Sequence, residues 1–317
     1  MTVPLNVAPR HRPILDPDFV PASLWTRAFA RLTESTTARP FRICLERSDG
    51  TRSTRESSLL PTDHDLARLN FTHVERLLKF LLWQKGGFRI HLGGDDALAR
   101  QLAAVYSPAG ERAWDCDFMG DKAYRQPMEF VIAALDEVPD SREAGSSLGG
   151  HLDGCRIGFD LGGSDRKCAA VIDGKVVHTE EIEWSPYFES DIEYHRAGIH
   201  DSIRRAAEHL PRVDAIGGSA AGVYVDSEPR VGSLFRGIPE ADFDSKVRPL
   251  FRQVQQAWNN VPLVVVNDGE VTALAGSMST GANSFLGIAM GTSQAVGYIT
   301  PEGNITSWLN ELAFAPI

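Results

Sequence analysis

The sequence predicts an α/β protein with two domains, a small α+β domain over residues 1–150 and a larger α/β domain after it. The chain has 317 residues, of which 43% are hydrophobic, and this is enough for two cores. In residues 138–154, VPDSREAGSSLGGHLDG, Ser, Gly, Pro and charged residues replace hydrophobic periodicity, so we place the domain boundary there. Beyond it, apolar runs typical of strands alternate with apolar stripes typical of helices.

The clearest element of the first domain is a helix over residues 70–84. Its apolar residues recur at three- and four-residue spacing, and Gly86-Gly87 follow as a stop signal. Residues 41–60 are typical of a hairpin that turns at Ser48-Asp49-Gly50. The other expected elements are a strand (88–92), a helix (95–106) and a strand (128–135). No motif that carries chemistry occurs in this domain.

The second domain begins with three strands joined by tight turns, and Asp173-Gly174 is the hairpin signal of the second turn. A helix over residues 191–210 follows from one broad apolar stripe, which Pro211 ends. In order, the expected elements are strands 155–160, 168–173 and 175–184, helix 191–210, strand 213–216, helix 240–258, strand 263–266, helix 270–278 and strands 285–290 and 295–300.

Composition and charge exclude several classes of protein. Residues 1–150 carry 19 Lys and Arg against 20 Asp and Glu, whereas the rest of the chain carries 13 against 22. This acidic second half argues against nucleic acid as a partner, because such binding needs clustered cations. The first residues lack the apolar segment of a signal peptide, and no apolar run is long enough to span a bilayer. We therefore expect a soluble, cytoplasmic protein without membrane contact.

The cysteines and histidines suggest neither a metal site nor a disulfide framework. The four cysteines are widely spaced, with no C-x-x-C pair, and we read them as reduced thiols. The nine histidines include no H-x-x-x-H pair, so none receives a role.

Glycines, hydroxyl residues and carboxylates gather where predicted strands end. Gly162-Gly163-Ser164 and Gly291-Thr292-Ser293 each join two strands, and glycine lets backbone N–H groups approach phosphate oxygens. Asp160 ends a strand and could hold Mg²⁺, which prefers carboxylate oxygen. Asp268, where a buried strand meets a helix, could accept the proton of an attacking hydroxyl group. Together these residues are typical of a nucleotide site for phosphoryl transfer.

Each of these features also has a purely structural interpretation. The glycine pairs could only permit turns, and Asn267-Asp268 could only cap a helix. Other templates fit worse, because the chain contains neither G-x-G-x-x-G at the first turn nor a P-loop. Residues 217–221, GGSAA, nearly match a nucleophile elbow, but the last position is Ala and no helix is expected to follow.

The second domain resembles the actin-like ATPase superfamily, and within it the ROK family of sugar kinases and repressors. The segment IGFDLGGSDRKCAAVIDGKVV from Ile157 is similar to the first phosphate loop of that family, D-x-G-G-T-K. GGSAAG resembles the loop beside the sugar, VVVNDGEVTALAG the segment of the catalytic base, and LGIAMGTSQAVGYITPEG the second phosphate loop. The resemblance covers about half of the chain, residues 155–317. It implies an actin-like (ribonuclease H-like) fold with a first lobe at 151–262 and an incomplete second lobe at 263–317.

The resemblance also implies roles for individual residues, with ATP and Mg²⁺ as cofactors and a sugar as substrate. Asp268 is the expected catalytic base and Asp160 the expected Mg²⁺ ligand. The expected nucleotide contacts are Asp160, Gly162, Gly163, Ser164, Lys167, Gly291, Thr292 and Ser293. The expected sugar contacts are Gly222, Asn267 and Glu311.

The chain departs from the family pattern at several positions. Ser164-Asp165 replaces Thr-Lys in the first loop, so a basic side chain must come from Arg166 or Lys167. Phe314 stands where the family has a zinc-binding histidine, so no zinc is expected there. Since only the first strands of a second lobe are present, we expect the chain to be a fragment of a longer protein.

Two functions remain open at this stage. The first is an ATP-dependent carbohydrate kinase, a transferase that moves the γ-phosphoryl group to a sugar hydroxyl. The second is a regulator that responds to a sugar or nucleotide without turnover and uses residues 1–150 for protein contact. A homodimer is a further expectation.

Overall fold

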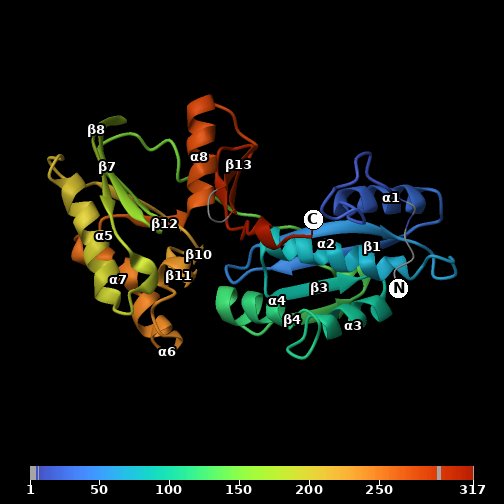
Figure 1. Cartoon of the computed structure of the whole chain (residues 1–317). Helices are drawn as coiled ribbons and strands as arrows, with labels where there is room; N and C mark the ends of the chain where they lie inside the picture. Colours follow the sequence, from blue (N-terminus) through green and yellow to red (C-terminus); the bar gives the residue numbers. More distant parts are fainter. Residues whose placement is uncertain (1–4, 6, 291–293, 317) are drawn as a thin grey trace. The chain divides into compact units, whose positions relative to one another are not determined.

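The computed structural model describes residues 5, 7–290 and 294–316, which form two compact units (Figure 1). Unit 1 extends to Ala144 and takes up the chain again from Trp308, and unit 2 consists of Gly145–Ser307. The unit boundary thus lies inside the Ser- and Gly-rich stretch where the sequence places it. Within the described residues, none of the helices combines the length and the apolar composition needed to cross a membrane.

Unit 1 contains a four-stranded sheet in the order β2-β1-β3-β4. β1 pairs antiparallel with β2 and β3, whereas β3 and β4 are parallel. Its regular elements are α1 (Ala22–Glu34), β1 (Arg39–Glu46), β2 (Arg52–Leu59), α2 (Leu69–Lys85), β3 (Arg89–Gly93), α3 (Asp96–Val105), α4 (Ala113–Asp117), a π-helix (Phe118–Tyr124) and β4 (Glu129–Ala133). The expected hairpin, helices and strands are confirmed. Helix α1, which buries Trp25 and Phe29 one turn apart, and the helical residues 113–124 were not predicted.

A buried arginine organises one side of unit 1. The side chain of Arg47 is 1% exposed, and its Nη2 donates to Glu143 Oε2 at 2.8 Å. Ser53 Oγ and Trp308 Nε1 also donate to the Glu143 carboxylate. Glu143 therefore neutralises a cation that water does not reach.

Removing this carboxylate is expected to destabilise unit 1. Glu143→Ala leaves the Arg47 guanidinium buried without its counter-charge, which costs about 2–3 kcal/mol of unfolding free energy once the partial exposure of Glu143 is allowed for. Urea unfolding of the full chain measures this. Glu56→Ala is the matched control, because Glu56 pairs with Arg42 but is 76% exposed. Equal losses for the two variants would contradict the prediction.

The last described residues belong to unit 1. The backbone N–H groups of Asn310 and Glu311 donate to the carbonyl groups of Gln84 and Trp83 at the end of α2. The ring of Phe314 lies 4.5 Å from that of Trp83. The assignment of residues 308–316 to a second lobe is therefore wrong, because backbone hydrogen bonds and aromatic packing hold them on unit 1.

Unit 2 contains a five-stranded sheet in the order β12-β9-β6-β7-β8. β6 (Cys155–Leu161), β7 (Asp165–Ile172) and β8 (Lys175–Glu183) form an antiparallel meander, and β9 (Ala215–Ala220) and β12 (Leu263–Asn267) continue it in parallel with β6. Asp173 and Gly174 both have positive φ at the β7–β8 turn, as expected of an Asp-Gly hairpin. A mixed sheet of three antiparallel strands followed by two parallel ones confirms the α/β class and agrees with the actin-like arrangement.

Helices α5 (Ile192–Ala207) and α7 (Leu250–Ala257) form the core of unit 2 with this sheet. The sequence predicted one helix over 240–258. The structure instead has α6 (Glu240–Asp242), a π-helical segment (Phe243–Val247) and α7, since Pro249 cannot donate the hydrogen bond that a continuous helix needs. Strand β9 extends through Gly217-Gly218, which the sequence treated as a loop.

Residues that the sequence left irregular form a second hairpin, β10 (Val223–Val225) and β11 (Glu228–Val231). Its turn residues Asp226 and Ser227 both have positive φ, which is the geometry of a type I′ turn. Asn-Gly is the usual signal for such a turn, and its absence explains why the hairpin was not predicted.

The second sheet of unit 2 has the order β13-β14-β15-β5, and α8 (Asp268–Thr280) packs on β13 and β14. The strands are β5 (Gly145–Ser146), β13 (Phe285–Met290), β14 (Gln294–Ile299) and β15 (Ile305–Thr306). The sequence started the second lobe at residue 263, but β12 is hydrogen bonded to β9 in the first sheet. The second lobe therefore starts no earlier than α8.

Glycines let α8 approach its sheet closely. A Cβ atom on Gly297 of β14 would lie 2.3 Å from the Gly269 carbonyl oxygen, and one on Gly269 would lie 2.4 Å from the Val296 nitrogen. A Cβ on Gly287 would meet the backbone of Ala273 at 2.5 Å. Close contact between the backbones of the helix and the sheet therefore fixes the position of α8, which begins with Asp268.

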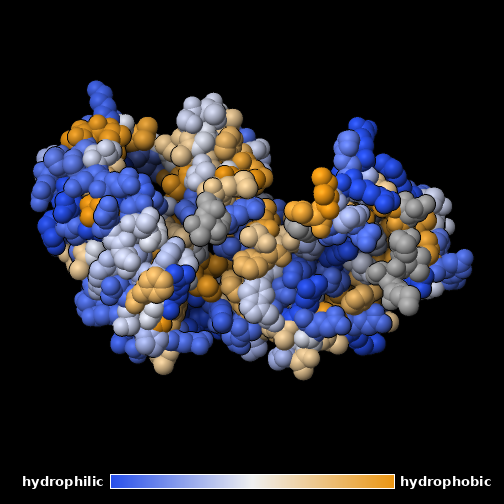
Figure 2. All heavy atoms as spheres, in the orientation of Figure 1, coloured by the Kyte–Doolittle hydropathy of each residue, from blue (hydrophilic) through white to orange (hydrophobic). Residues whose placement is uncertain are grey.

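The visible surface is mainly hydrophilic over α5, and an apolar group of side chains lies at the β7–β8 end of unit 2 (Figure 2). Val176 and Val177 on β8 are 63% and 47% exposed. Scattered apolar side chains of this kind are ordinary on protein surfaces.

Candidate functional site

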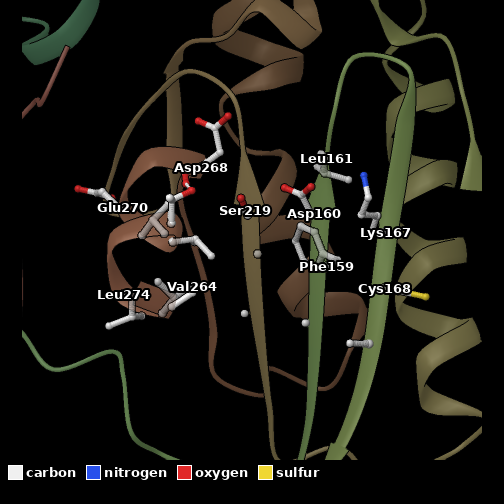
Figure 3. Close-up of a pocket in the computed structure, with 18 of the residues that line it drawn as sticks. Phe159, Asp160, Leu161, Lys167, Cys168, Ser219, Val264, Asp268, Glu270 and Leu274 are labelled. Carbon is white, nitrogen blue, oxygen red and sulfur yellow. Dashed lines mark hydrogen bonds between the residues drawn. The ribbon is translucent and has the colours of Figure 1, made fainter. Parts of the chain in front are cut away.

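The carboxyl ends of β6, β9 and β12 meet at one edge of the five-stranded sheet. Asp160 on β6 is in register with Ser219 on β9, and Ala220 on β9 is in register with Asn267 on β12. These ends open on a cleft of about 1370 Å³ within unit 2, which Asp160, Lys167, Ser219 and Asp268 line (Figure 3). In open α/β sheets, ligands bind outside the carboxyl ends of the strands.

Asp268 is the first residue of α8 and is half-buried in this cleft. Burial raises the pKa of its carboxyl group above the usual range, and the negative charge of Asp160 raises it further. The Gly269 N–H donates to the carboxylate at 3.2 Å and opposes this shift. Two carboxyl groups predicted from separate parts of the sequence thus share one electrostatic environment. A carboxyl group with a raised pKa is suited to accept a proton.

Asn267 ties the end of β12 to the loop after β9. Its Oδ1 accepts from the Gly269 N–H at 2.7 Å and caps α8, and its Nδ2 donates to the Gly222 carbonyl at 2.7 Å. Gly222 has a φ of 130°, and a Cβ there would lie 2.3 Å from the Val231 carbonyl oxygen. The structure therefore brings together two residues that were predicted to contact a sugar, and one N–H and one lone pair of the amide remain for a ligand.

Loss of this amide is expected to weaken the junction. Asn267→Ala removes the helix cap and the bond to Gly222, at a cost of about 2 kcal/mol of unfolding free energy. Asn267→Ser retains an acceptor for the cap but no donor for Gly222, so it should recover about half of that loss. Urea unfolding of the three proteins measures these differences. If the Ser variant is as unstable as the Ala variant, the cap contributes nothing.

The first glycine turn is closed by its own hydrogen bonds. The Gly162 N–H donates to the Asp165 carbonyl at 2.9 Å, and Trp184 Nε1 donates to the Gly162 carbonyl at 2.8 Å. A Cβ on Gly163 would lie 2.1 Å from the hydroxyl oxygen of Tyr187, which also lines the cleft. In this structure the space beside Gly163 is thus filled by a phenol.

The polar residues of this turn bind one another. Ser164 Oγ donates to Asp165 Oδ2 at 3.0 Å, and Lys167 Nζ forms an ion pair with the other Asp165 oxygen. The hydrogen bond from Lys167 holds the pKa of Asp165 below its usual range, and the reciprocal bond raises the pKa of Lys167. Lys167 lines the main cleft, whereas Ser164 lines a smaller cavity with Asp165 and Trp184.

Sequence reasoning missed one buried tyrosine near Asp268 and one residue that lines the cleft. Burial and the charge of Asp268 raise the pKa of Tyr224, which lies on β10 just after Gly222. Glu270 lines the cleft from the first turn of α8. A recognised β10–β11 hairpin would have suggested Tyr224, because a tight hairpin directs its strands back toward the preceding glycine.

The remaining predicted residues are Gly291, Thr292, Ser293 and Glu311. Gly291, Thr292 and Ser293 lie outside the described residues. Glu311 belongs to unit 1, where its backbone N–H donates to the Trp83 carbonyl, and its contact with the sugar stays a prediction.

Mg²⁺ and a nucleotide were predicted as ligands of this site, and the donor set suits the metal. Asp160 presents carboxylate oxygens to the cleft beside Asp268, and Mg²⁺ is bound by one or two carboxylates together with substrate phosphates. At the first turn the Gly162 N–H cannot donate to a nucleotide phosphate in this conformation, because it already donates to the Asp165 carbonyl.

No protein-family model and no curated protein matches the sequence. Similar solved structures include a ROK hexokinase from Thermus thermophilus, 20% identical, with a TM-score of 0.39 and coverage of 51% of each chain. A ROK family transcriptional regulator, a homolog of the E. coli MLC protein, is 20% identical with a TM-score of 0.38, and the match covers 49% of this chain and 38% of the regulator. A hexokinase from Schistosoma mansoni complexed with glucose is 16% identical with a TM-score of 0.36, covering 49% and 38%.

The matches thus span about half or less of each of these proteins. Two of these proteins, an enzyme and a regulator, are named as members of the family that the sequence motifs resemble. The fold assignment for this chain rests on the strand order and pairing described above.

Proposed function

We propose that unit 2 binds a sugar and a nucleotide in its cleft and acts in ATP-dependent, ROK-type phosphoryl transfer to a sugar hydroxyl. The observation that carries the proposal is the shared environment of Asp160 and Asp268 at the carboxyl ends of β6 and β12. Burial and like charge give Asp268 the raised pKa that a general base needs. Asp160 remains available for the metal ion that accompanies a nucleotide.

The roles of the other cleft residues follow from their positions. Asp268 accepts the proton of the sugar hydroxyl and orients its oxygen toward the phosphorus atom. Asn267 and Gly222, each next to a residue that lines the cleft, contact the sugar, and their mutual hydrogen bond fixes their positions. Bound Mg²⁺ would neutralise the phosphate charge that develops in transfer, and Asp160 would hold it.

A sugar-stimulated nucleotide assay tests the proposal. The full chain is incubated with ATP, Mg²⁺ and each member of a panel of hexoses and N-acetylated hexosamines, and ADP release is followed. At least one sugar is expected to stimulate ADP release. If no sugar does so while the protein still binds a nucleotide in calorimetry, transfer by this chain is rejected and binding remains.

The first turn favours a second candidate, a regulator that binds sugar or nucleotide without turnover. Asp165 stands where the family pattern has lysine, and it engages both Ser164 and Lys167. The carboxylate thereby occupies two groups that would otherwise meet a phosphate. A site built in this way can hold a sugar while binding ATP weakly.

Removing this carboxylate should strengthen nucleotide binding. Asp165→Ala frees Lys167 from a partly exposed ion pair of up to about 1 kcal/mol, so Mg²⁺–ADP is expected to bind about two- to fivefold more tightly. Isothermal titration calorimetry compares the variant with the wild type, and Asp165→Asn, which keeps an acceptor for Lys167, serves as control. An unchanged dissociation constant for Asp165→Ala would mean that Lys167 does not reach the phosphates.

A further inference from the structure

A second group of ligand-type side chains lies on the face of the sheet that packs against α5, and two of its members, Cys168 and Glu180, also border the cleft. Cys168 on β7 and Glu180 on β8 are direct cross-strand partners, and His178 lies two residues before Glu180, on the same face of β8. One donor atom from each lies within 4.8 Å of the other two. Figure 3 shows the Cys168 sulfur on the far side of β7 from the carboxylate of Asp160. The thiol therefore points away from Asp160, although Cys168 and Glu180 border the same cleft.

The chemistry of the three side chains is that of a zinc site. A thiolate, an imidazole nitrogen and a carboxylate are three of the ligand types that bind Zn²⁺, and three protein ligands leave a fourth tetrahedral position for water. Zn²⁺ bond lengths place ligand atoms about 3.3–3.8 Å apart. Side-chain rotations that move the donor atoms by roughly 1 Å would bring them from within 4.8 Å of one another to the spacing that Zn²⁺ requires. A Cys⁻, a Glu⁻ and a neutral His would balance the charge of the ion.

An orphaned nitrogen supports the assignment independently. His178 Nε2 is buried and makes no hydrogen bond within the described part of the chain, and Glu180 Oε2 lies 3.5 Å away. Buried polar atoms normally make a hydrogen bond, whereas this nitrogen has only the Glu180 carboxylate at ion-pair distance, and a metal ion between the two would bind both. The His178 ring stacks on His209 at 3.8 Å, which fixes its plane.

The surrounding residues hold the carboxylate in place. Arg205 Nη1 donates to Glu180 Oε1 at 2.7 Å, so Oε2 is the oxygen left for the metal. Arg205 is itself bound by Asp201 at 2.9 Å, which offsets its positive charge. Such outer-shell partners orient metal ligands in known sites.

We propose that Cys168, His178 and Glu180 bind a Zn²⁺ ion that ties β7 to β8 beside the end of α5. The spacing of these residues along the sequence resembles no zinc motif, because the ligands come from two paired strands. The ion would lie on the α5 side of β7, the strand that also carries Lys167. Its role is to join the two strands of the β7–β8 hairpin, independently of whether the cleft is catalytic.

Metal titration of the chelator-treated full chain tests this proposal. Co²⁺ is added first, since a cobalt–thiolate bond gives a charge-transfer absorption band, and Zn²⁺ affinity is then measured by competition with a chromophoric chelator. We expect one ion per chain, loss of the band in Cys168→Ser, and a Zn²⁺ affinity in His178→Gln reduced by more than the about 10–100-fold that an outer-shell partner costs.

Two matched variants control for the substitutions. Cys155→Ser alters another buried thiol of unit 2, and His209→Gln removes the ring that stacks on His178 without removing a ligand. Both should retain the band. If Cys168→Ser does not fold, His178→Gln and Glu180→Gln decide, because both side chains are partly exposed. Binding that is not stoichiometric, a band that survives Cys168→Ser, or an unchanged Zn²⁺ affinity in His178→Gln and Glu180→Gln overturns the proposal.

Discussion

Asp268→Asn is expected to reduce sugar-dependent ADP release by about 10²–10⁴-fold, the usual contribution of a general base. The amide keeps the shape of the side chain but cannot accept the proton of the attacking hydroxyl group. Nucleotide and sugar affinities should change little, so the loss should fall on kcat. Steady-state kinetics with the stimulating sugar measure the effect. Glu240→Gln is the control, since Glu240 is an exposed carboxylate of unit 2 that does not line the cleft and should retain activity.

The same variant has an expected effect on stability that depends on pH. Because folding raises the pKa of Asp268, the folded state binds more protons than the unfolded state between the usual and the raised pKa. This carboxyl group therefore lowers stability as the pH rises through that interval. Asp268→Asn should be more stable than the wild type at pH 7, and the difference should disappear on acidification below the usual pKa. If the difference in unfolding free energy between the variant and the wild type is the same at pH 4 and at pH 7 within experimental error, this coupling is excluded.

Gly297→Ala is expected to destabilise the packing of α8 on β13 and β14 by about 2–3 kcal/mol, or to prevent this packing. The new methyl group would lie 2.3 Å from the Gly269 carbonyl oxygen and 2.5 Å from the Glu270 Cα atom. Both are backbone atoms, so relief requires the helix and the strand to separate. Urea unfolding gives the free energy, and hydrogen exchange of peptides from α8 and β14 locates the change.

Gly217→Ala is the matched control for this packing. Gly217 also lies in a strand, but a Cβ there would meet no atom within 4 Å. Its stability should stay within about 0.5 kcal/mol of the wild type. Equal effects of the two substitutions would show that close backbone contact is not what Gly297 provides.

The sequence predicted the sheet-forming parts of both units well. Strands β6, β7 and β12 are marked by apolar runs with clear ends, and the Asp173-Gly174 turn has a specific residue signal. Local periodicity did not indicate the break at Pro249, because the apolar spacing continues through it. It also missed the β10–β11 hairpin, whose Asp226-Ser227 turn lacks glycine.

The sequence could predict the carboxylates of the candidate site, but not which side chains contact one another there. Asp160 and Asp268 could be singled out because each ends a buried strand, and parallel strands bring such ends together. That Lys167 would pair with Asp165, and that Tyr187 would lie beside Gly163, depends on side-chain packing that no local pattern encodes. The cluster of Cys168, His178 and Glu180 was invisible for the same reason, since strand register alone creates it.

Residues 308–317 make unit 2 an insertion in the chain of unit 1. The chain enters unit 2 through β5 and leaves it after β15, and these two strands are hydrogen bonded to each other. On the unit 1 side, Glu143 and Trp308 are likewise bonded. Because entry and exit points are adjacent in each unit, a short linker from Ala144 to Trp308 should give unit 1 as a continuous chain. The cleft-bearing unit and the α+β unit are thereby open to separate expression and separate assay.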